Sequence, residues 1–177
     1  EAPDILWLRD TDGDGVCDRR EVLYTGFGYG ATHATTSNLR WGPDGWIHGT
    51  QGYSGGASRD IRSPYRDRED ARESVSYGHV PNGLFRFRAD GSEIQTVSAY
   101  GSNTWGLDFR PDGELFFTMA NGSHLRHVMA PEAALSAARL GGARSWRDIV
   151  DHREVHRISE ATRSPYVQID FVGGFTA

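Results

Sequence analysis

An all-β fold is predicted by three observations on the sequence. One phrase occurs twice, as Leu39–Thr50 and as Leu107–Thr118, and each copy places a Pro-Asp-Gly turn between two alternating apolar runs. This pattern is typical of a β-hairpin, because Pro presets φ and Gly accepts a positive φ. The copies begin 68 residues apart, and removing the 25 residues of Ser54–Gly78 leaves 43. One four-stranded propeller blade needs roughly 40 to 45 residues, so a partial β-propeller of about two blades is predicted.

The other segments extend this pattern along the chain, which we interpret as one incomplete propeller domain over residues 1–177. The predicted order is outer hairpin, inner hairpin, charged insertion, outer hairpin, inner hairpin and a C-terminal excursion with short helices. The corresponding segments are Ile5–Arg9 with Arg20–Thr25, Leu39–Thr50, Ser54–Gly78, Leu84–Arg88 with Glu93–Ser98, Leu107–Thr118, and Pro131–Leu140 with Ser145–Asp151. The charged insertion has no periodicity and is predicted to be a mobile surface segment.

Antiparallel order also predicts which connections share an end of the strands. The turns at Pro43–Gly45, Asp90–Gly91 and Pro111–Gly113, together with the loop at Asp10–Asp18, are expected at one end, here called the turn end. The other connections are expected at the opposite end, here called the loop end. Binding groups usually lie on long loops over a rigid scaffold, so a site is predicted at the loop end.

Composition excludes several classes of protein. All 19 basic residues are Arg, so the chain has neither a phosphate-loop lysine nor a Schiff-base lysine. Cys17 is the single cysteine, which excludes an internal disulfide and a CxxCH haem site within these residues. A net charge of -5 with scattered arginines argues against nucleic acid as a partner. The sequence has no initiating Met and no signal peptide, and we expect a segment of a longer protein.

The loop from Asp10 to Glu21 matches the calcium-loop pattern DxDxDG with Glu at its twelfth position. Its five carboxylates repel one another, and a divalent cation would relieve that repulsion. The predicted structural calcium would take oxygen ligands from Asp10, Asp12, Asp14, the Val16 carbonyl, Asp18 and Glu21. The alternative is a solvated Asp/Gly turn without an ion, since strands rather than helices flank the loop.

Several polar residues are expected at the loop end. His33 precedes an inner strand and could act as a general base, although a hydrogen-bonded structural histidine is the alternative. His124, Arg126 and His127 could hold a metal or an anion, with a polar network as the alternative. Asn103 and Asn121 lie at inner-strand ends, where they could line a channel. Packing between blades is predicted for three tryptophans, Trp41, Trp46 and Trp105.

Four stretches of the chain resemble the membrane-bound dehydrogenase propellers of planctomycetes and verrucomicrobia: THATTSNLRWGPDGWIHGTQG, NGLFRFRADGSEI, GSNTWGLDFRPDGELFFTMANGSHLRHV and YVQIDFVGGFTA. That family is similar to the soluble quinoprotein glucose and sorbosone dehydrogenases. The resemblance implies a periplasmic or secreted oxidoreductase that uses pyrroloquinoline quinone, with any c-type cytochrome domain and its haem outside this chain. It also implies that His33 takes the proton from a substrate hydroxyl. Ser102 stands where those enzymes place an Arg near the quinone.

The function predicted from the residues and the resemblance together is oxidation of a sugar or an alcohol by a quinoprotein-like dehydrogenase propeller. The residues predicted to contact the cofactor are Asn103, Asn121, His124, Arg126 and His127. The alternative function is a non-catalytic propeller that binds a glycan or a protein partner, having kept the scaffold without the chemistry.

Overall fold

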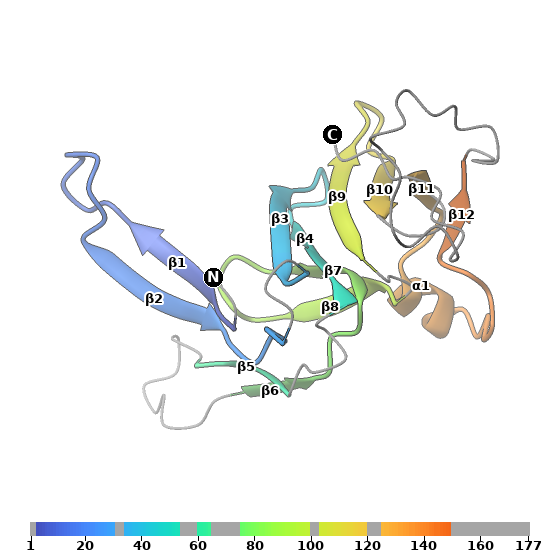
Figure 1. Cartoon of the computed structure of the whole chain (residues 1–177), viewed down its shortest axis with the longest axis horizontal. Helices are drawn as coiled ribbons and strands as arrows, with labels where there is room; N and C mark the ends of the chain where they lie inside the picture. Colours follow the sequence, from blue (N-terminus) through green and yellow to red (C-terminus); the bar gives the residue numbers. More distant parts are fainter. Residues whose placement is uncertain are drawn as a thin grey trace, which may run out of the picture.

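A computed structural model of the chain describes residues 3–30, 34–53, 60–64, 75–99, 103–119 and 125–149. Two four-stranded antiparallel sheets form its centre, as Figure 1 shows. The first blade orders its strands β3 (Thr36–Trp41), β4 (Ile47–Gln51), β7 (Gly83–Phe87) and β8 (Ile94–Ser98). The second blade orders β9 (Thr104–Phe109), β10 (Leu115–Met119), β11 (Leu125–Val128) and β12 (Trp146–Asp148). The predicted all-β class is confirmed, and each copy of the repeat supplies the first hairpin of a blade.

Two smaller antiparallel pairs flank the first blade. β1 (Ile5–Arg9) pairs with β2 (Arg19–Tyr24), as the sequence predicts for the first outer hairpin. β5 (Ile61–Ser63) pairs with β6 (Val75–Gly78), and both lie within the predicted surface insertion. Ile61 is fully buried in the core, so the prediction of a wholly superficial insertion is wrong for this part of it. A backbone bridge from Thr25 to Arg62 ties the insertion to the first hairpin.

The first blade is covered on both faces because apolar residues of β7 point alternately to each side. Leu84 packs with Leu107, Leu115 and Phe117 in the core between the two blades. Phe85 and Phe87 enter the other core, which includes residues of the β1–β2 and β5–β6 pairs. Phe85 contacts the Phe27 ring at 5.2 Å between centroids. Both faces of the first blade are therefore at least partly buried against other described residues.

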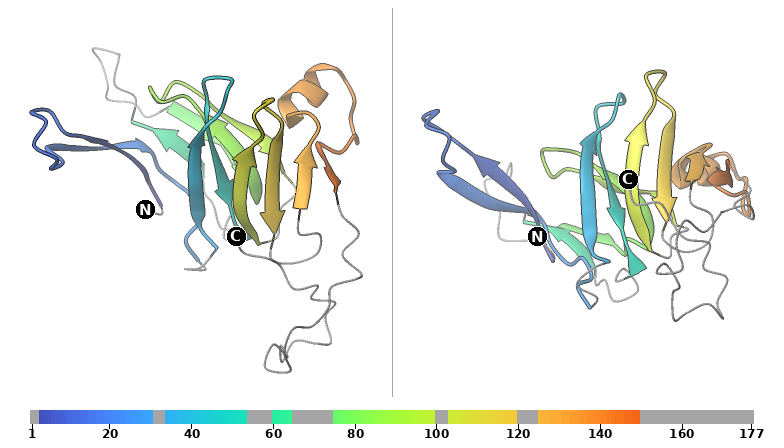
Figure 2. Two further views of the ribbon diagram at one scale, coloured as in Figure 1. Left: turned by 90° about the horizontal axis from the view of Figure 1, so that it is seen from above. Right: turned by 45° about the horizontal axis from the view of Figure 1, so that its top comes forward.

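The two Pro-Asp-Gly turns have the conformation that the sequence predicts. Gly45 and Gly113 have φ values of 73° and 89°, in the region that favours glycine. An added Cβ at Gly113 would lie 3.4 Å from the Pro43 ring, so the two turns are neighbours. In Figure 2 both turns lie at one end of the blades, whereas the loop between β1 and β2 extends away from them. The shared turn end is confirmed for the two Pro-Asp-Gly turns, and the Asp10–Asp18 loop lies apart from them.

Asn38 joins the innermost strands of the two blades. It occupies the left-handed region with φ of 56°, at a point where the register between β3 and β4 shifts. Its side-chain amide donates to the backbone carbonyl of Trp105 on β9 and to the Thr50 hydroxyl on β4. Asparagine adopts this backbone conformation more readily than most residues. The bulge thus turns a strand residue into a link between blades.

One of the two predicted helices is present. α1 (Glu132–Ala137) follows Pro131, and a Glu132 carboxylate oxygen accepts a hydrogen bond from the Ala99 amide at 2.5 Å. The second prediction, a helix over Ser145–Asp151, is wrong for its described part, because Trp146–Asp148 form β12. The buried Trp146 pairs with Val128 in the sheet, so packing overrides local helix preference. Among the described residues, no helix has the length and apolarity needed to cross a lipid bilayer.

Of the three tryptophans predicted to pack between blades, only Trp46 is buried. Trp46 is buried, and the guanidinium groups of Arg88 and Arg86 lie over its ring at 3.9 and 4.6 Å. Trp41 and Trp105 are exposed by 65% and 38%, so the prediction is wrong for these two residues. Both belong to innermost strands, which neighbour another described strand along one edge only.

Truncation of Phe85 tests the double-sided burial of the first blade. We expect Phe85→Ala to lower the free energy of unfolding by about 3–5 kcal/mol, because it removes a fully buried ring and leaves a cavity. Trp41→Ala is the matched control, and its effect should stay within about 0.5 kcal/mol because the side chain is exposed. Urea unfolding measures both changes, and equal losses in the two variants would contradict the described core.

Candidate functional site

The structure separates the residues that the sequence predicts for a cofactor site. His33, Asn121 and His124 lie outside the described residues. Asn103, Arg126 and His127 are described. Arg126 and His127 are neighbours on β11, so their side chains project from opposite faces of the second blade. The predicted grouping of these two residues at one site is therefore not found.

Arg126 is part of the interior of the second blade. Its side chain is buried, and its Nε donates to a carboxylate oxygen of Asp148 on β12 at 3.0 Å. Its guanidinium lies 3.8 Å from the centre of the Trp146 ring and also contacts the Met119 sulfur. These contacts are typical of a buried, paired guanidinium that fastens the outer strand. The Arg126 guanidinium is therefore directed into its own blade by these contacts.

Thr104 begins the innermost strand β9 at the loop end, and Asn103 directly precedes it. The Asn103 carboxamide oxygen and the Thr104 hydroxyl are buried, and neither has a hydrogen-bond partner in the part of the chain that the structure describes. A buried polar atom without a partner is unfavourable, and such atoms are rare in folded proteins. Of the described residues predicted to bind a cofactor, Asn103 alone keeps an unpaired polar atom at the loop end.

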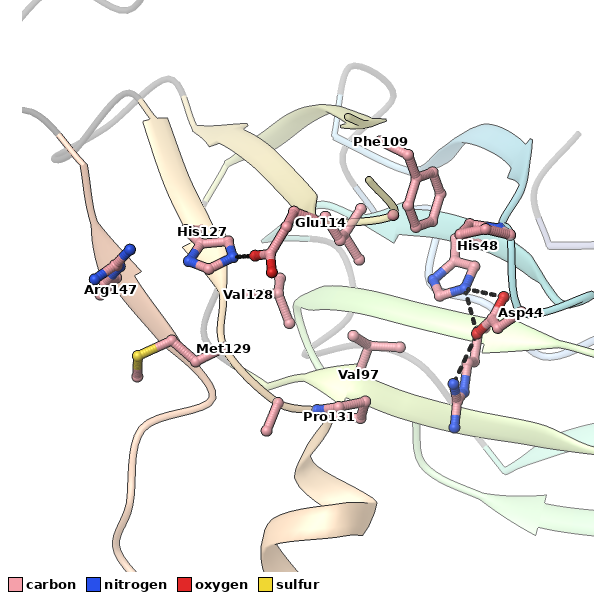
Figure 3. Close-up of a pocket in the computed structure, with 15 residues that line it drawn as sticks. Asp44, His48, Val97, Phe109, Glu114, His127, Val128, Met129, Pro131 and Arg147 are labelled. Carbon is pink, nitrogen blue, oxygen red and sulfur yellow. Dashed lines mark hydrogen bonds and ion pairs between the residues drawn. The ribbon is translucent and has the colours of Figure 1, made fainter. Parts of the chain in front are cut away.

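His127 lies instead in a cavity of about 450 Å³ toward the turn end (Figure 3). Its Nε2 is paired with the Glu114 carboxylate, and its ring stacks on Phe116 with centroids 4.9 Å apart. Across the cavity are His48, Asp44 and Arg86 of the first blade. The cavity thus brings two histidine–carboxylate pairs to one place, and of these four residues only His127 is among the site residues predicted from the sequence.

His48 is the most buried polar group of this cavity, with 4% of its side chain exposed. Its Nε2 lies 3.2 Å from both carboxylate oxygens of Asp44, and Nδ1 is buried with no partner among the described residues. Burial lowers the pKa of His48, and this effect exceeds the opposing effect of Asp44. Nε2 therefore donates to Asp44, and the neutral imidazole presents Nδ1 as an acceptor.

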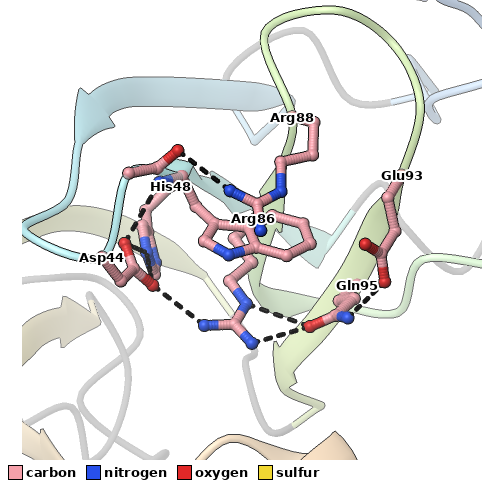
Figure 4. Close-up of polar contacts among 8 residues, drawn as sticks. Asp44, His48, Arg86, Arg88, Glu93 and Gln95 are labelled. Atoms are coloured by element: carbon pink, nitrogen blue, oxygen red, sulfur yellow. Dashed lines mark hydrogen bonds and ion pairs between the residues drawn. The ribbon is translucent and has the colours of Figure 1, made fainter.

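Asp44 stays ionised beside this imidazole. Burial alone would raise its pKa, but the Trp46 amide, His48 and Arg86 together lower it. Arg86 donates to Asp44 at 2.9 Å and is itself held by Gln95. Figure 4 shows this chain of polar contacts. A signal for the pair was present in the sequence, because His48 occupies the position that Phe116 has in the second copy of the repeat.

The predicted calcium loop brings together three of its carboxylates. Asp10, Asp12 and Asp18 each place an oxygen within 4.8 Å of the others. Hydrogen bonds from Gly15 and Gly13 lower the pKa of Asp10, and those from Thr11 lower the pKa of Asp18. Asp10 and Asp18 are therefore ionised at neutral pH, but the same hydrogen bonds occupy oxygens that an ion would need.

The other predicted calcium ligands are arranged differently. Asp14 accepts a hydrogen bond from the Val16 amide at 2.7 Å. Glu21 lies inside β2 and contacts Arg19 at 3.2 Å. Glu21, at the twelfth position of the pattern, is therefore a strand residue paired with Arg19, whereas the three clustered carboxylates lie in the loop.

Comparison with known proteins gives a family and no function. A family model described as a domain of unknown function (DUF7133) matches residues 1–177. No curated protein and no solved structure matches the chain.

The lowered pKa of His48 predicts a loss of stability in acid. The unfolded chain binds a proton near the ordinary histidine pKa of 6.5, whereas folded His48 binds it only at lower pH. The free energy of unfolding is therefore expected to fall as the pH drops below about 6.5. Urea unfolding between about pH 7.5 and pH 5.5 measures this slope. His48→Phe should reduce the slope, and an equal slope in both proteins would contradict the assignment.

Proposed function

We propose that this chain, which belongs to the DUF7133 family over residues 1–177, forms part of a β-propeller dehydrogenase. Its proposed reaction is the oxidation of a sugar or an alcohol. The observation that carries the proposal is the pair of unpaired polar atoms on Asn103 and Thr104 at the start of an innermost strand. A hydroxylated substrate could supply donors and acceptors to both atoms. The resemblance to quinoprotein dehydrogenases adds the reaction type, and with it a periplasmic or secreted location.

The strand arrangement favours a site shared by both blades at this end. β3 and β9 both run toward the neighbouring Pro-Asp-Gly turns, so their starts lie at the same end. His33 precedes the start of β3 by three residues. In the proposal, His33 accepts the proton of the substrate hydroxyl while the adjacent carbon loses hydride to a two-electron acceptor of the quinone class.

The described residues do not fit a quinone site by themselves. Arg126 is paired with Asp148 inside the blade, and His127 lies in the turn-end cavity. Neither side chain is therefore directed to the start of β9, and a quinone anion would need another donor. We assign no quinone contact to Arg126 or His127. The position of Arg126 favours the second candidate function, a propeller that binds a glycan or a protein partner without catalysis.

Turnover of sugars and alcohols by the full-length protein, with added pyrroloquinoline quinone and a dye acceptor, separates the two functions. If His33 is the base, His33→Ala should lower kcat by about 10²- to 10⁴-fold. His152→Ala is the matched control and should retain activity, since the proposal gives this histidine no role. Unchanged activity in His33→Ala would exclude the base assignment. Sugar binding without turnover would support the binding propeller.

Calcium binding by the Asp10–Asp18 loop is a separate proposal, supported by the proximity of Asp10, Asp12 and Asp18. Binding to the folded state alone should raise Tm, by an amount equivalent to about 2.7 kcal/mol at a calcium concentration of 100 times Kd. Thermal melting during a calcium titration measures the shift. The double variant Asp12→Asn with Asp18→Asn should abolish it, and Asp112→Asn should not. A Tm independent of calcium in the unmodified protein would favour the solvated turn.

A further inference from the structure

The cavity between the turn ends of the two blades contains a fixed hydrogen-bond acceptor that the proposed dehydrogenase does not use. We propose that this cavity binds a small uncharged ring bearing hydroxyl groups, such as a pyranose, with one hydroxyl donating to Nδ1 of His48. The site is distinct from the start of β9, which lies at the opposite end of the strands. The sugar-binding proposal can therefore be tested independently of the proposed dehydrogenase.

The orientation of His48 is fixed by a chain of polar contacts. Gln95 accepts two hydrogen bonds from Arg86 at 2.7 and 3.0 Å, and Arg86 donates to Asp44 at 2.9 Å. Asp44 in turn accepts from Nε2 of His48 (Figure 4). Because each group holds the next, the proton is kept on Nε2 and the lone pair on Nδ1. In Figure 3 the Nδ1 side of the ring faces the cavity.

Sterics also hold the imidazole in place. A Cβ added at Gly42 would lie 2.8 Å from both Nε2 and Cδ2 of His48, closer than real Cβ contacts come. On the other side, the Phe109 ring meets the imidazole edge-on at 5.0 Å. The ring thus has little freedom to turn Nδ1 toward another partner. A buried acceptor held without a partner is unfavourable, and a ligand hydroxyl would satisfy it.

The opposite wall supplies complementary polar groups. Glu114 is about half exposed and is held by His127, which leaves it able to accept a second hydroxyl. Arg147 is an exposed cavity residue with no partner among the described residues, and its guanidinium can donate to a ligand oxygen. Two carboxylates and two guanidinium groups around the cavity balance in charge. This balance favours a neutral ligand over an anion or a cation.

Apolar side chains complete the lining of the cavity. They are Val97, Leu115, Val128, Met129 and Pro131. A pyranose has apolar C–H faces and hydroxyl groups around its edge, which matches this mixed lining. The cavity volume of about 450 Å³ also falls within the range of small-molecule sites.

The test uses D-glucose, D-galactose and D-mannose as probes on the full-length protein. Imidazole nitrogen resonances of His48 report both its tautomer and the binding event, and isothermal titration gives the affinity. We expect at least one sugar to shift the Nδ1 resonance of a neutral, Nε2-protonated His48. His48→Phe and Asp44→Asn should each weaken that binding by about tenfold or more. Asp112→Asn changes the equivalent turn residue of the second copy and should leave binding unchanged.

Three results would overturn the proposal. They are a proton on Nδ1 in the sugar-free protein, the absence of any His48 shift up to the solubility limit of the three sugars, and undiminished binding in both His48→Phe and Asp44→Asn. If His48→Phe does not fold, Asp44→Asn alone decides, because it keeps the imidazole and removes the group that fixes its tautomer. Turnover that depends on His33 and survives Asp44→Asn would separate this site from the proposed dehydrogenase site.

Discussion

Burial of the first blade on both faces is the constraint on which the rest of the structure depends. Leu84 faces the second blade while Phe85 and Phe87 face the β1–β2 and β5–β6 pairs, so neither side of this sheet is left wholly to solvent. Every polar side chain that β4 contributes must then find a partner inside the protein. Thr50 finds the Ser37 hydroxyl, Gln51 the Thr36 hydroxyl, and His48 the carboxylate of Asp44. His48 is the group that this burial leaves half satisfied, because its Nδ1 has no partner among the described residues.

The parts of the fold that were predicted correctly depend on short-range patterns. The Pro-Asp-Gly turns, the alternation around them and the pairing of the flanking strands follow from residues a few positions apart. The errors come from long-range packing. Trp146 is drawn into a sheet by Val128, and Ile61 is drawn into a core by residues distant in sequence. Neither contact has a local signal in the sequence.

The candidate site shows the same division. The segment His124–His127 is recognisable in the sequence as a group of possible ligands. Strand alternation nevertheless places Arg126 in the blade interior and His127 in the turn-end cavity. His48 was not singled out because a lone histidine in a strand has no motif. Its significance depends on burial, on the Asp44 carboxylate four residues earlier and on Arg86 from β7. The calcium loop is recognisable by spacing, whereas the position of Glu21 inside β2 depends on where that strand begins.

The difference between the two copies at a single position has a consequence for how such a protein can diversify. His48 and Phe116 occupy the same place in hairpins whose turns and flanking strands are otherwise built alike. One aromatic ring carries a lone pair and the other does not, while both fill comparable space beside the third strand of their blade. Because the hairpin is repeated, ligand binding can be gained or lost by a substitution in one blade while the geometry of the neighbouring blade is kept.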